Sequence, residues 1–163
     1  MADGPKPKVL FLCTGNACRS QMAEGWARHL RAAVLEAWSA GVQSRGLDPR
    51  AVRVMAEAGV DISAHRSKHV REVAGVPFDY VVTVCDNTRE SCPLFPGKAR
   101  VLHVGFDDPP ALARGAKTEE EALAPYRRVR DAIRAFVETL PEALADLPRG
   151  PGGKGLESGR AGG

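Results

Sequence analysis

The residues best suited to chemistry lie in one octapeptide near the start of the chain. Residues 13–20 read Cys-Thr-Gly-Asn-Ala-Cys-Arg-Ser. The thiolate of Cys13 would be a nucleophile, and the guanidinium of Arg19 has the forked shape that binds a tetrahedral oxyanion. The segment therefore predicts an anion-binding loop with a nucleophile at its entrance. The residues expected to bind the oxyanion are Thr14, Gly15, Asn16, Ala17, Cys18, Arg19 and Ser20.

The octapeptide joins a predicted strand to a predicted helix. The apolar run 9–12 is too short for a core helix, so we interpret it as a buried strand. After the loop, Met22, Trp26 and Leu30 recur at four-residue steps, which is typical of one face of a helix. Backbone N–H groups and the helix dipole at such a helix start attract anions and favour a thiolate. We expect Gly15 to provide a tight, left-handed or strained turn.

A purely structural interpretation of these residues is also open. Cys13 could be a buried core thiol and Gly15 an ordinary turn residue. Few structural cysteines, however, stand in a loop between a strand and a helix in this way. Cys18, inside the loop, is expected to pack beneath the anion site rather than to react.

The composition describes one soluble domain. The chain has 163 residues, of which 44% are hydrophobic, enough for a core. No apolar stretch approaches the roughly 18 residues of a membrane span, and residues 1–8 contain no signal-peptide core, so we expect a cytoplasmic monomer. The net charge of +3 comes from interspersed charges, which gives nucleic-acid binding little support. We expect one domain over 1–148 and a disordered Gly-rich tail over 149–163.

The four cysteines are Cys13, Cys18, Cys85 and Cys92. In a cytosolic protein such thiols are more often catalytic, redox-active or metal-binding than joined in structural disulfides. A zinc site would favour short cysteine knuckles at both ends. Here one pair is spaced Cys-x6-Cys and the other lies inside the anion loop. We therefore expect neither a metal nor a cofactor.

Further strands and helices are predicted after the first helix. Apolar and β-branched runs predict strands over 35–40, 78–84 and 100–105. Asp48 and Pro49 are typical of a helix start, and we expect that helix to run to Ala58. The side chains expected to face inward from it are Val52, Met55 and Ala56.

The remaining helices are predicted from charge and capping patterns. A short basic helix with a solvated face is expected over 63–73. The pattern Thr118-x-x-Glu121 resembles a capping box and starts a long helix, although Pro125 could move the start to 124–126. One or two further turns are expected over 141–147. The apolar stripe of the long helix is Val129, Ile133, Phe136, Val137 and Leu140.

Strands that alternate with helices predict an α/β fold. We expect a three-layer sandwich, in which a four-stranded parallel sheet carries helices on both faces. Ligands in such sheets bind at the carboxyl ends of the strands. The Cys13 loop, Cys85 and the pair Asp107-Asp108 each follow a strand directly, so we expect them to converge at one edge. Of the two aspartates, we expect Asp107 to be structural.

The Cys-x5-Arg-Ser pattern between a strand and a helix resembles the low-molecular-weight tyrosine phosphatase superfamily, which implies the fold of that superfamily. Such a phosphatase needs a nucleophile, an oxyanion cradle and a general acid. Cys13, the loop with Arg19, and an aspartate after the last strand would supply them. Nothing in that chemistry requires Cys85 or Cys92. Reduction of an oxyanion does require two electrons, and two thiols provide them when they become a disulfide.

Three motifs together resemble a narrower family. In their order and spacing they are similar to the thioredoxin-coupled arsenate reductases over about residues 8–140. Arsenate has the shape and charge of phosphate, and phosphate and sulfate would act as its analogues, but thiols readily reduce arsenic(V). The motifs are residues 13–25, the segment Cys85-x6-Cys92-Pro93, and the run Gly105-Phe106-Asp107-Asp108-Pro109.

The resemblance implies a relay of three thiols. The Cys13 thiolate would attack arsenate bound by the loop and Arg19, and Asp108 would protonate the departing oxygen. Cys85 would attack the Cys13–arsenic adduct, releasing arsenite and leaving a Cys13–Cys85 disulfide. Cys92 would then attack Cys85, and thioredoxin would reduce the resulting Cys85–Cys92 disulfide by thiol exchange.

The chain departs from this family at a cation site. Some members hold potassium with residues that match Asn16, Glu24, Ser39 and an acidic residue further on. In this chain Lys68 stands at the last of these places. We expect its ammonium group to replace the ion, so that activity does not depend on potassium.

Two other functions remain open. A low-molecular-weight tyrosine or small-ester phosphatase would use Cys13, Arg19 and Asp108. Those phosphatases usually carry tyrosines beside the aspartate to flank an aromatic substrate, however, and this chain has Pro110. A non-enzymatic redox or arsenic-sensing protein would bind arsenite through its thiols without turnover and would need neither cradle nor acid. A reductase could itself retain weak phosphatase activity, because the two chemistries share these groups.

Overall fold

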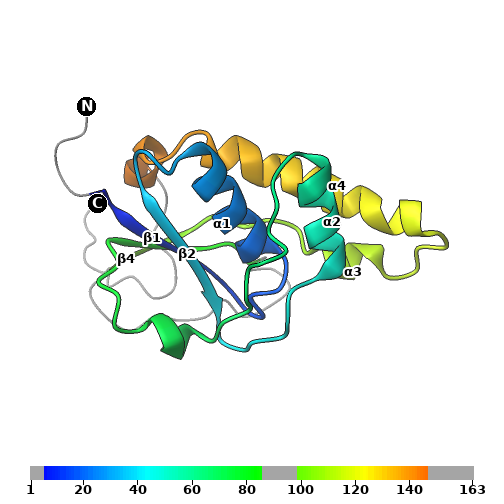
Figure 1. The fold of residues 1–163 in the computed structure, drawn as a ribbon, viewed down its shortest axis with the longest axis horizontal. Coiled ribbons are helices and arrows are strands. Elements are labelled where there is room, and N and C mark those ends of the chain that lie inside the picture. The colour runs from blue at the N-terminus through cyan, green and yellow to red at the C-terminus, as the bar shows by residue number, and fades with distance from the viewer. Residues whose placement is uncertain (1–5, 86–98, 147–163) are drawn as a thin grey trace.

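Four parallel strands form the centre of the molecule. The computed structural model of the chain describes residues 6–85 and 99–146 (Figure 1). The strands β1 (Lys8–Cys13), β2 (Glu36–Gly41), β3 (Tyr80–Thr83) and β4 (Arg100–His103) lie in the order β2-β1-β3-β4. The predicted four-stranded parallel sheet is therefore confirmed. β3 and β4 are each shorter than the predicted strands: residues 78–79 and 84 lie outside β3, and residues 104–105 lie outside β4.

The position of β1 between β2 and β3 places the Cys13 loop at the middle of one sheet edge. Cys13 pairs with Gly41 of β2, and Leu12 pairs with Thr83 of β3. The N–H group of Val84 then donates to the carbonyl of Leu12 over 3.0 Å. The carboxyl ends of three strands consequently stand at one level, as predicted for the residues that follow them.

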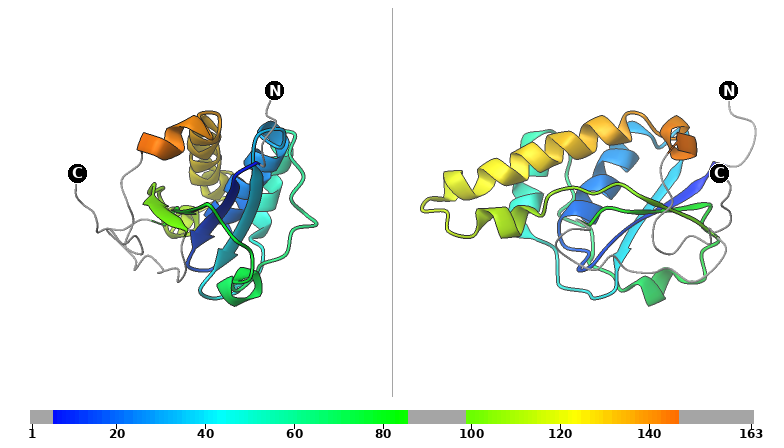
Figure 2. Two further views of the ribbon diagram at one scale, coloured as in Figure 1. Left: turned by 90° about the vertical axis from the view of Figure 1, so that its left-hand side faces the viewer. Right: turned by 180° about the vertical axis from the view of Figure 1, so that it is seen from behind.

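Three helices cover one face of the sheet. They are α1 (Arg19–Leu30), α2 (Pro49–Glu57) and α4 (Glu119–Val137), and Figure 2 shows α1 and α4 on the same side. Their apolar side chains pack against Val9 and Phe11 of β1. Trp26 of α1 lies in this core, and its indole N–H donates to the carbonyl of Arg130 over 3.1 Å.

The second face carries a smaller core. Leu10 and Leu12 of β1 face it together with Val81. It is covered by the 3-10 helix η1 (Val70–Val73) and by Phe78, whose ring meets Trp38 edge-on with centroids 5.3 Å apart. The α/β fold with helical segments on both faces is thus confirmed, although the two outer layers are unequal.

The predicted basic helix over 63–73 was wrong for most of its length. Among these residues the structure has only η1, and residues 64–69 cross the Cys13 loop without forming a helix. Their polar backbone groups bond to other segments: the carbonyl of Arg66 accepts from Gln21, and that of Lys68 accepts from the N–H of Gly41. A helix would have used these groups internally.

The inward face of α2 also differs from the prediction. Ala51, Val54 and Met55 are buried, whereas Ala56 is exposed and Val52 is half-buried. The rotation of this helix follows from its anchor. Asp48 caps it by accepting the N–H of Arg50 over 2.9 Å, and its other carboxylate oxygen accepts the hydroxyl of Tyr126 on α4 over 2.7 Å.

α4 begins at Glu119, so Pro125 lies inside the helix and does not move its start. Thr118 caps it by accepting the N–H of Glu121, as the capping pattern predicted. The predicted turns after α4 are η2 (Glu142–Asp146). Of the predicted stripe, Val129, Ile133, Val137 and Leu140 are buried and Phe136 is half-buried.

Sequence patterns did not predict the short helix α3 (Pro109–Ala113). The predicted tail over 149–163 lies outside the described residues, so the domain boundary at 148 stays a prediction. None of the helices within residues 6–85 and 99–146 is both long and apolar enough to cross a membrane.

Gly25 tests how tightly α1 packs on the segment before η1. A Cβ atom there would lie 2.6 Å from Cγ2 of Ile62 and 3.1 Å from Cε of Met55. We expect Gly25→Ala to lower the free energy of unfolding by about 1–2 kcal/mol, because overlap outweighs the gain in helix propensity. Urea denaturation of purified variants measures this.

Two controls sharpen the Gly25 experiment. A Cβ atom on Gly75 would meet nothing within 4 Å, so Gly75→Ala should change stability little. In an Ile62→Ala background, Gly25→Ala should lose most of its cost, since the obstructing methyl group is gone. A Gly25→Ala variant as stable as the parent would contradict the packing described.

Candidate active site

A cavity of about 270 Å³ opens where β1 meets α1. The loop between them supplies most of its wall, and the remaining wall comes from the segment after β2 and from α3. The nucleophile predicted from sequence, the forked arginine and one aspartate all line the same space. The lining residues are Cys13, Thr14, Gly15, Ala17, Cys18, Arg19, Arg45, Asp108, Pro110 and Arg114.

The sulfur of Cys13 is surrounded by hydrogen-bond donors. The backbone N–H of Asn16 donates to it over 3.3 Å, and the hydroxyl of Ser20 lies 2.8 Å away. Ser20 Oγ already accepts a bond from the side-chain amide of Asn16 over 2.9 Å. The hydroxyl proton of Ser20 is therefore available to Cys13, and both contacts stabilise a thiolate at this position.

The left-handed turn of the loop was predicted at Gly15, but in the structure it lies at Asn16. Asn16 has φ of +49° and is fully buried. Its amide nitrogen donates to Ser20 and to Ser39 of β2, while its oxygen accepts the N–H of Lys68 over 2.7 Å and the amide of Gln21 over 3.0 Å. Asparagine tolerates this conformation better than most residues, and these bonds hold it there.

Two glycines let other segments approach the loop. A Cβ atom on Gly41 would lie 2.7 Å from the carbonyl oxygen of Thr14 and 2.8 Å from the nitrogen of Asn16. A Cβ atom on Gly15 would lie 2.8 Å from Cδ of Arg45. Gly41 therefore allows β2 to touch the loop, and Gly15 allows the stem of Arg45 to cover it.

Arg19 and Asp108 meet at the cavity, as expected for an oxyanion ligand and its acid. Arg19 is buried and donates to the carbonyl of Phe106 over 3.0 Å, while its other nitrogen lies 3.5 Å from Asp108 Oδ1. Asp108 stands at the N-cap of α3, but its carboxylate does not cap that helix. Asp107 is exposed and pairs with Arg128 of α4 over 3.7 Å, consistent with the predicted structural role.

Cys18 occupies the N-cap position of α1 and is buried in the loop, as predicted. Burial raises the pKa of its thiol well above the usual value, and the nearby carboxylate of Asp48 acts in the same direction. A neutral, buried thiol is a poor nucleophile.

The two distal cysteines were predicted to act with Cys13. Cys85 follows β3, the strand beside β1, and is fully buried. It is disulfide-bonded. Cys92 lies outside the described residues, so its predicted role stays a prediction. Cys13 and Cys18 are free thiols.

The buried carboxylate of Glu24 lies close to Lys68, the residue whose ammonium group was predicted to replace a cation. Glu24 Oε1 accepts the hydroxyl of Ser39 over 2.6 Å and lies 3.9 Å from Nζ of Lys68. Its other oxygen pairs with Arg28 over 2.8 Å. Desolvation lowers the pKa of Lys68. The ammonium group therefore lies beside Glu24, one of the residues that the resemblance assigns to the ion.

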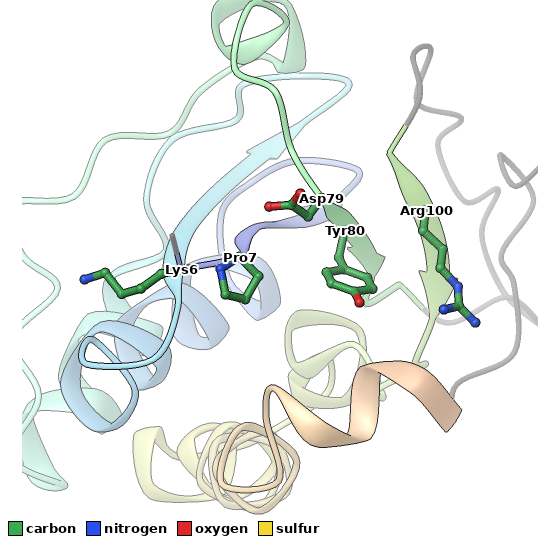
Figure 3. Close-up of a pocket in the computed structure, with 5 residues that line it drawn as sticks. All are labelled: Lys6, Pro7, Asp79, Tyr80 and Arg100. Atoms are coloured by element: carbon green, nitrogen blue, oxygen red, sulfur yellow. The ribbon is translucent and has the colours of Figure 1, made fainter. Parts of the chain in front are cut away.

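A larger cavity, of about 390 Å³, lies at the opposite edge of the sheet. Figure 3 shows Tyr80, the first residue of β3, between Pro7 and Arg100, the first residue of β4, with Asp79 next to Tyr80 and the Lys6 side chain directed away from them. Among the described residues no cysteine lines it, and the Asp79 carboxylate already accepts the N–H of Lys8 over 2.8 Å. The described lining therefore offers no thiol for redox chemistry.

Some residues of the site were missed by the sequence analysis. Gly41, Arg45, Arg114 and Gln21 had no assigned role. The signal for the first two was present: Gly41 ends the strand adjacent to β1 and Arg45 follows that strand, so both had to emerge at the same edge as Cys13. Within residues 6–85 and 99–146, no three His, Cys, Asp or Glu side chains gather as a metal site would require.

Residues 8–148 match the family of low molecular weight phosphotyrosine protein phosphatases. The chain belongs to that family. The arsenate reductase of Halalkalibacterium halodurans is 42% identical over 137 residues, which cover 84% of this chain and 96% of that protein. A solved arsenate reductase in the phosphate binding state has a TM-score of 0.68 at 30% identity, covering 87% of this chain and 99% of that chain. The thioredoxin-dependent arsenate reductase of Corynebacterium glutamicum has a TM-score of 0.56 at 25% identity, covering 87% of this chain and 63% of that one.

Two substitutions of Asn16 separate the contribution of its hydrogen bonds to stability from that of backbone strain. Asn16→Gly loses the side-chain bonds but accepts a positive φ, and we expect it to lower the free energy of unfolding by about 2–3 kcal/mol. Asn16→Ala loses the bonds and is also strained, so it should be less stable by about a further 1 kcal/mol. Urea denaturation of both variants measures the difference. An alanine variant equal to or more stable than the glycine variant would show that the left-handed turn is not a constraint.

Proposed function

We propose that this protein is an arsenate reductase, acting as a cytoplasmic monomer and recharged by thioredoxin. The observation that carries the proposal is the position of Cys13 between an oxyanion-binding arginine, an acid and a second cysteine at the end of the adjacent strand. Arg19 and Asp108 line its cavity, and Cys85 follows β3. The named relatives support reduction of arsenate as the chemistry, and the C. glutamicum protein supports thioredoxin as the reductant.

The first step forms a bond between Cys13 sulfur and arsenic. Arsenate binds to the loop N–H groups and Arg19, and the thiolate attacks the arsenic atom. An oxygen leaves as water after it takes a proton from Asp108, which lies 3.5 Å from Arg19 at the cavity. Arsenic remains As(V) in this step, and no electrons are transferred.

The second step transfers the electron pair. The thiolate of Cys85 attacks the sulfur of Cys13, so that an S–S bond forms and the S–As bond breaks. The bonding pair stays with arsenic, which leaves as As(III) in arsenite. The two sulfurs together lose two electrons.

The remaining steps restore the nucleophile. Cys92 attacks the sulfur of Cys85 and releases the Cys13 thiolate, and thioredoxin reduces the new disulfide by thiol exchange. A free Cys13 together with a disulfide-bonded Cys85 is the combination expected once Cys13 has been released. Cys18 takes no part, because its raised pKa keeps it neutral.

A phosphatase is the alternative, because it would use Cys13, Arg19 and Asp108 in the same positions. The side chain beside Asp108 in the cavity is Pro110, and no aromatic residue is among the lining residues given above. The described lining residues therefore offer an aryl phosphate no aromatic ring to stack on. Weak phosphatase activity remains compatible with the shared nucleophile, cradle and acid.

Steady-state turnover separates the two functions. With arsenate, thioredoxin, thioredoxin reductase and NADPH, the parent protein should consume NADPH, and Cys13→Ser, Cys85→Ser and Cys92→Ser should each reduce the rate at least 100-fold, because each removes one thiol of the relay. Reactions without thioredoxin are the control. The proposal fails if the parent does not turn over arsenate while it hydrolyses p-nitrophenyl phosphate and only Cys13→Ser stops that hydrolysis.

Lys68 should make turnover independent of potassium. Its ammonium group already stands 3.9 Å from the Glu24 carboxylate, so an added cation would gain no partner there. We expect equal rates in KCl and NaCl at the same ionic strength. Lys68→Ala should become slower and recover in KCl more than in NaCl. A several-fold stimulation of the parent protein by potassium would contradict this role for Lys68.

A further inference from the structure

Two arginines outside the Cys-x5-Arg loop line the same cavity. Arg45 comes from the segment between β2 and α2, and Arg114 is the residue that ends α3. Both side chains belong to exposed residues, unlike the buried Arg19. They therefore stand at the entrance, while Arg19 stands at the base.

Arg45 contacts the Cys13 loop through both its backbone and its side chain. Its backbone N–H donates to the carbonyl of Gly15 over 3.0 Å, and its Cδ would lie 2.8 Å from a Cβ on Gly15. Its guanidinium Nε donates to Gln43 Oε1 over 2.7 Å. The charge of Arg45 is thus fixed beside the mouth by its backbone, its stem and its head group.

Arg114 is positioned by the short helix that carries Asp108. α3 is anchored by buried Pro109 and Ala113, and the N–H of Arg114 bonds back to the carbonyl of Ala111. The next residue, Gly115, has φ of +83° and turns the chain away. Arg114 is therefore tied to the element that also places the acid.

The charges of the cavity are strongly unbalanced. Among the described residues, its lining contains Arg19, Arg45 and Arg114 against one carboxylate, that of Asp108, which faces Arg19. Within the described part of the chain, neither Arg45 nor Arg114 forms an ion pair with a carboxylate. A concave wall with charge of one sign focuses the field and raises the local concentration of opposite ions.

We propose that Arg45 and Arg114 are specificity-determining residues that select small inorganic oxyanions carrying two negative charges. They concentrate the dianion at the entrance before the loop captures it, and the described lining residues include no aromatic ring that would favour an organic ester. Which dianion is then reduced rests on the proposed function. The selection itself concerns binding, and phosphate can report it.

Protection of Cys13 by inorganic phosphate tests the proposal without requiring turnover. Alkylation of Cys13 by iodoacetamide, which is uncharged, is followed by peptide mass spectrometry at increasing phosphate concentration. We expect the half-protecting concentration to rise about threefold in Arg45→Gln and in Arg114→Gln, and about tenfold in the double variant. The differences should shrink at high ionic strength, because salt screens exposed charges.

Two further variants distinguish charge from structure. Arg134→Gln removes an exposed arginine of α4 that lies over the Trp26 ring, and its half-protecting phosphate concentration should equal that of the parent. Arg45→Lys keeps the charge but not the planar head group. Its half-protecting phosphate concentration should remain within twofold of the parent's. The proposal is overturned if the half-protecting phosphate concentration of the double variant equals that of the parent. It is also overturned if Arg45→Lys raises this concentration as much as Arg45→Gln does.

Kinetics with arsenate separate this proposal from the proposed function. The double variant should raise KM about tenfold and leave kcat unchanged, since the arginines act before chemistry. If the parent turns over arsenate but phosphate protection is unaffected in the double variant, the selection proposal fails alone. If protection weakens as expected but the parent does not reduce arsenate, the reductase proposal fails and the selection stands.

Discussion

The buried amide of Asn16 is the interaction on which the reactive loop depends. It joins three separate parts of the chain: the start of α1 through Ser20 and Gln21, β2 through Ser39, and the backbone of Lys68. Each polar atom of this side chain is used, as burial requires. The backbone of Asn16 is fixed as a result, and its N–H group is directed at the sulfur of Cys13.

The same network explains why a charge lies buried behind the site. Ser39, which accepts from Asn16, donates to Glu24, and that carboxylate is balanced by Lys68 and Arg28. A carboxylate left without cations there would be costly. Positive charge behind the loop is thus part of its support, whereas the positive charge of Arg19 in the cavity serves the ligand. The two sets of cations act on opposite sides of the loop backbone.

Sequence patterns predicted the elements that are local and failed where distant segments meet. The strands, the start of α1 and the Thr118 cap follow from short-range periodicity and capping chemistry. The extended course of residues 64–69 depends instead on bonds to the Cys13 loop, which no local pattern reveals. A run rich in basic side chains suggested a helix because its tertiary partners were unknown.

In the site, too, some features could be predicted from the sequence and others could not. Cys13, Arg19 and Asp108 could be predicted because their types and order indicate the chemistry, and the structure brings all three to one cavity. The left-handed turn was assigned to Gly15, because glycine adopts it most easily, but the buried bonds of Asn16 outweigh that preference. Arg114 could not be found from residue type alone, since exposed arginines are common and only the fold places it at the mouth, whereas Arg45 carried a signal only through its place after β2.

A single-turnover experiment with Cys92→Ser tests the central claim most directly. Without Cys92 the relay should stop after arsenite has left, so the fully reduced variant mixed with excess arsenate should release one arsenite per protein and accumulate a Cys13–Cys85 disulfide, identified by peptide mass spectrometry. Arsenite release without that disulfide, or a disulfide between Cys13 and Cys18 in its place, would contradict the proposed route of the electrons.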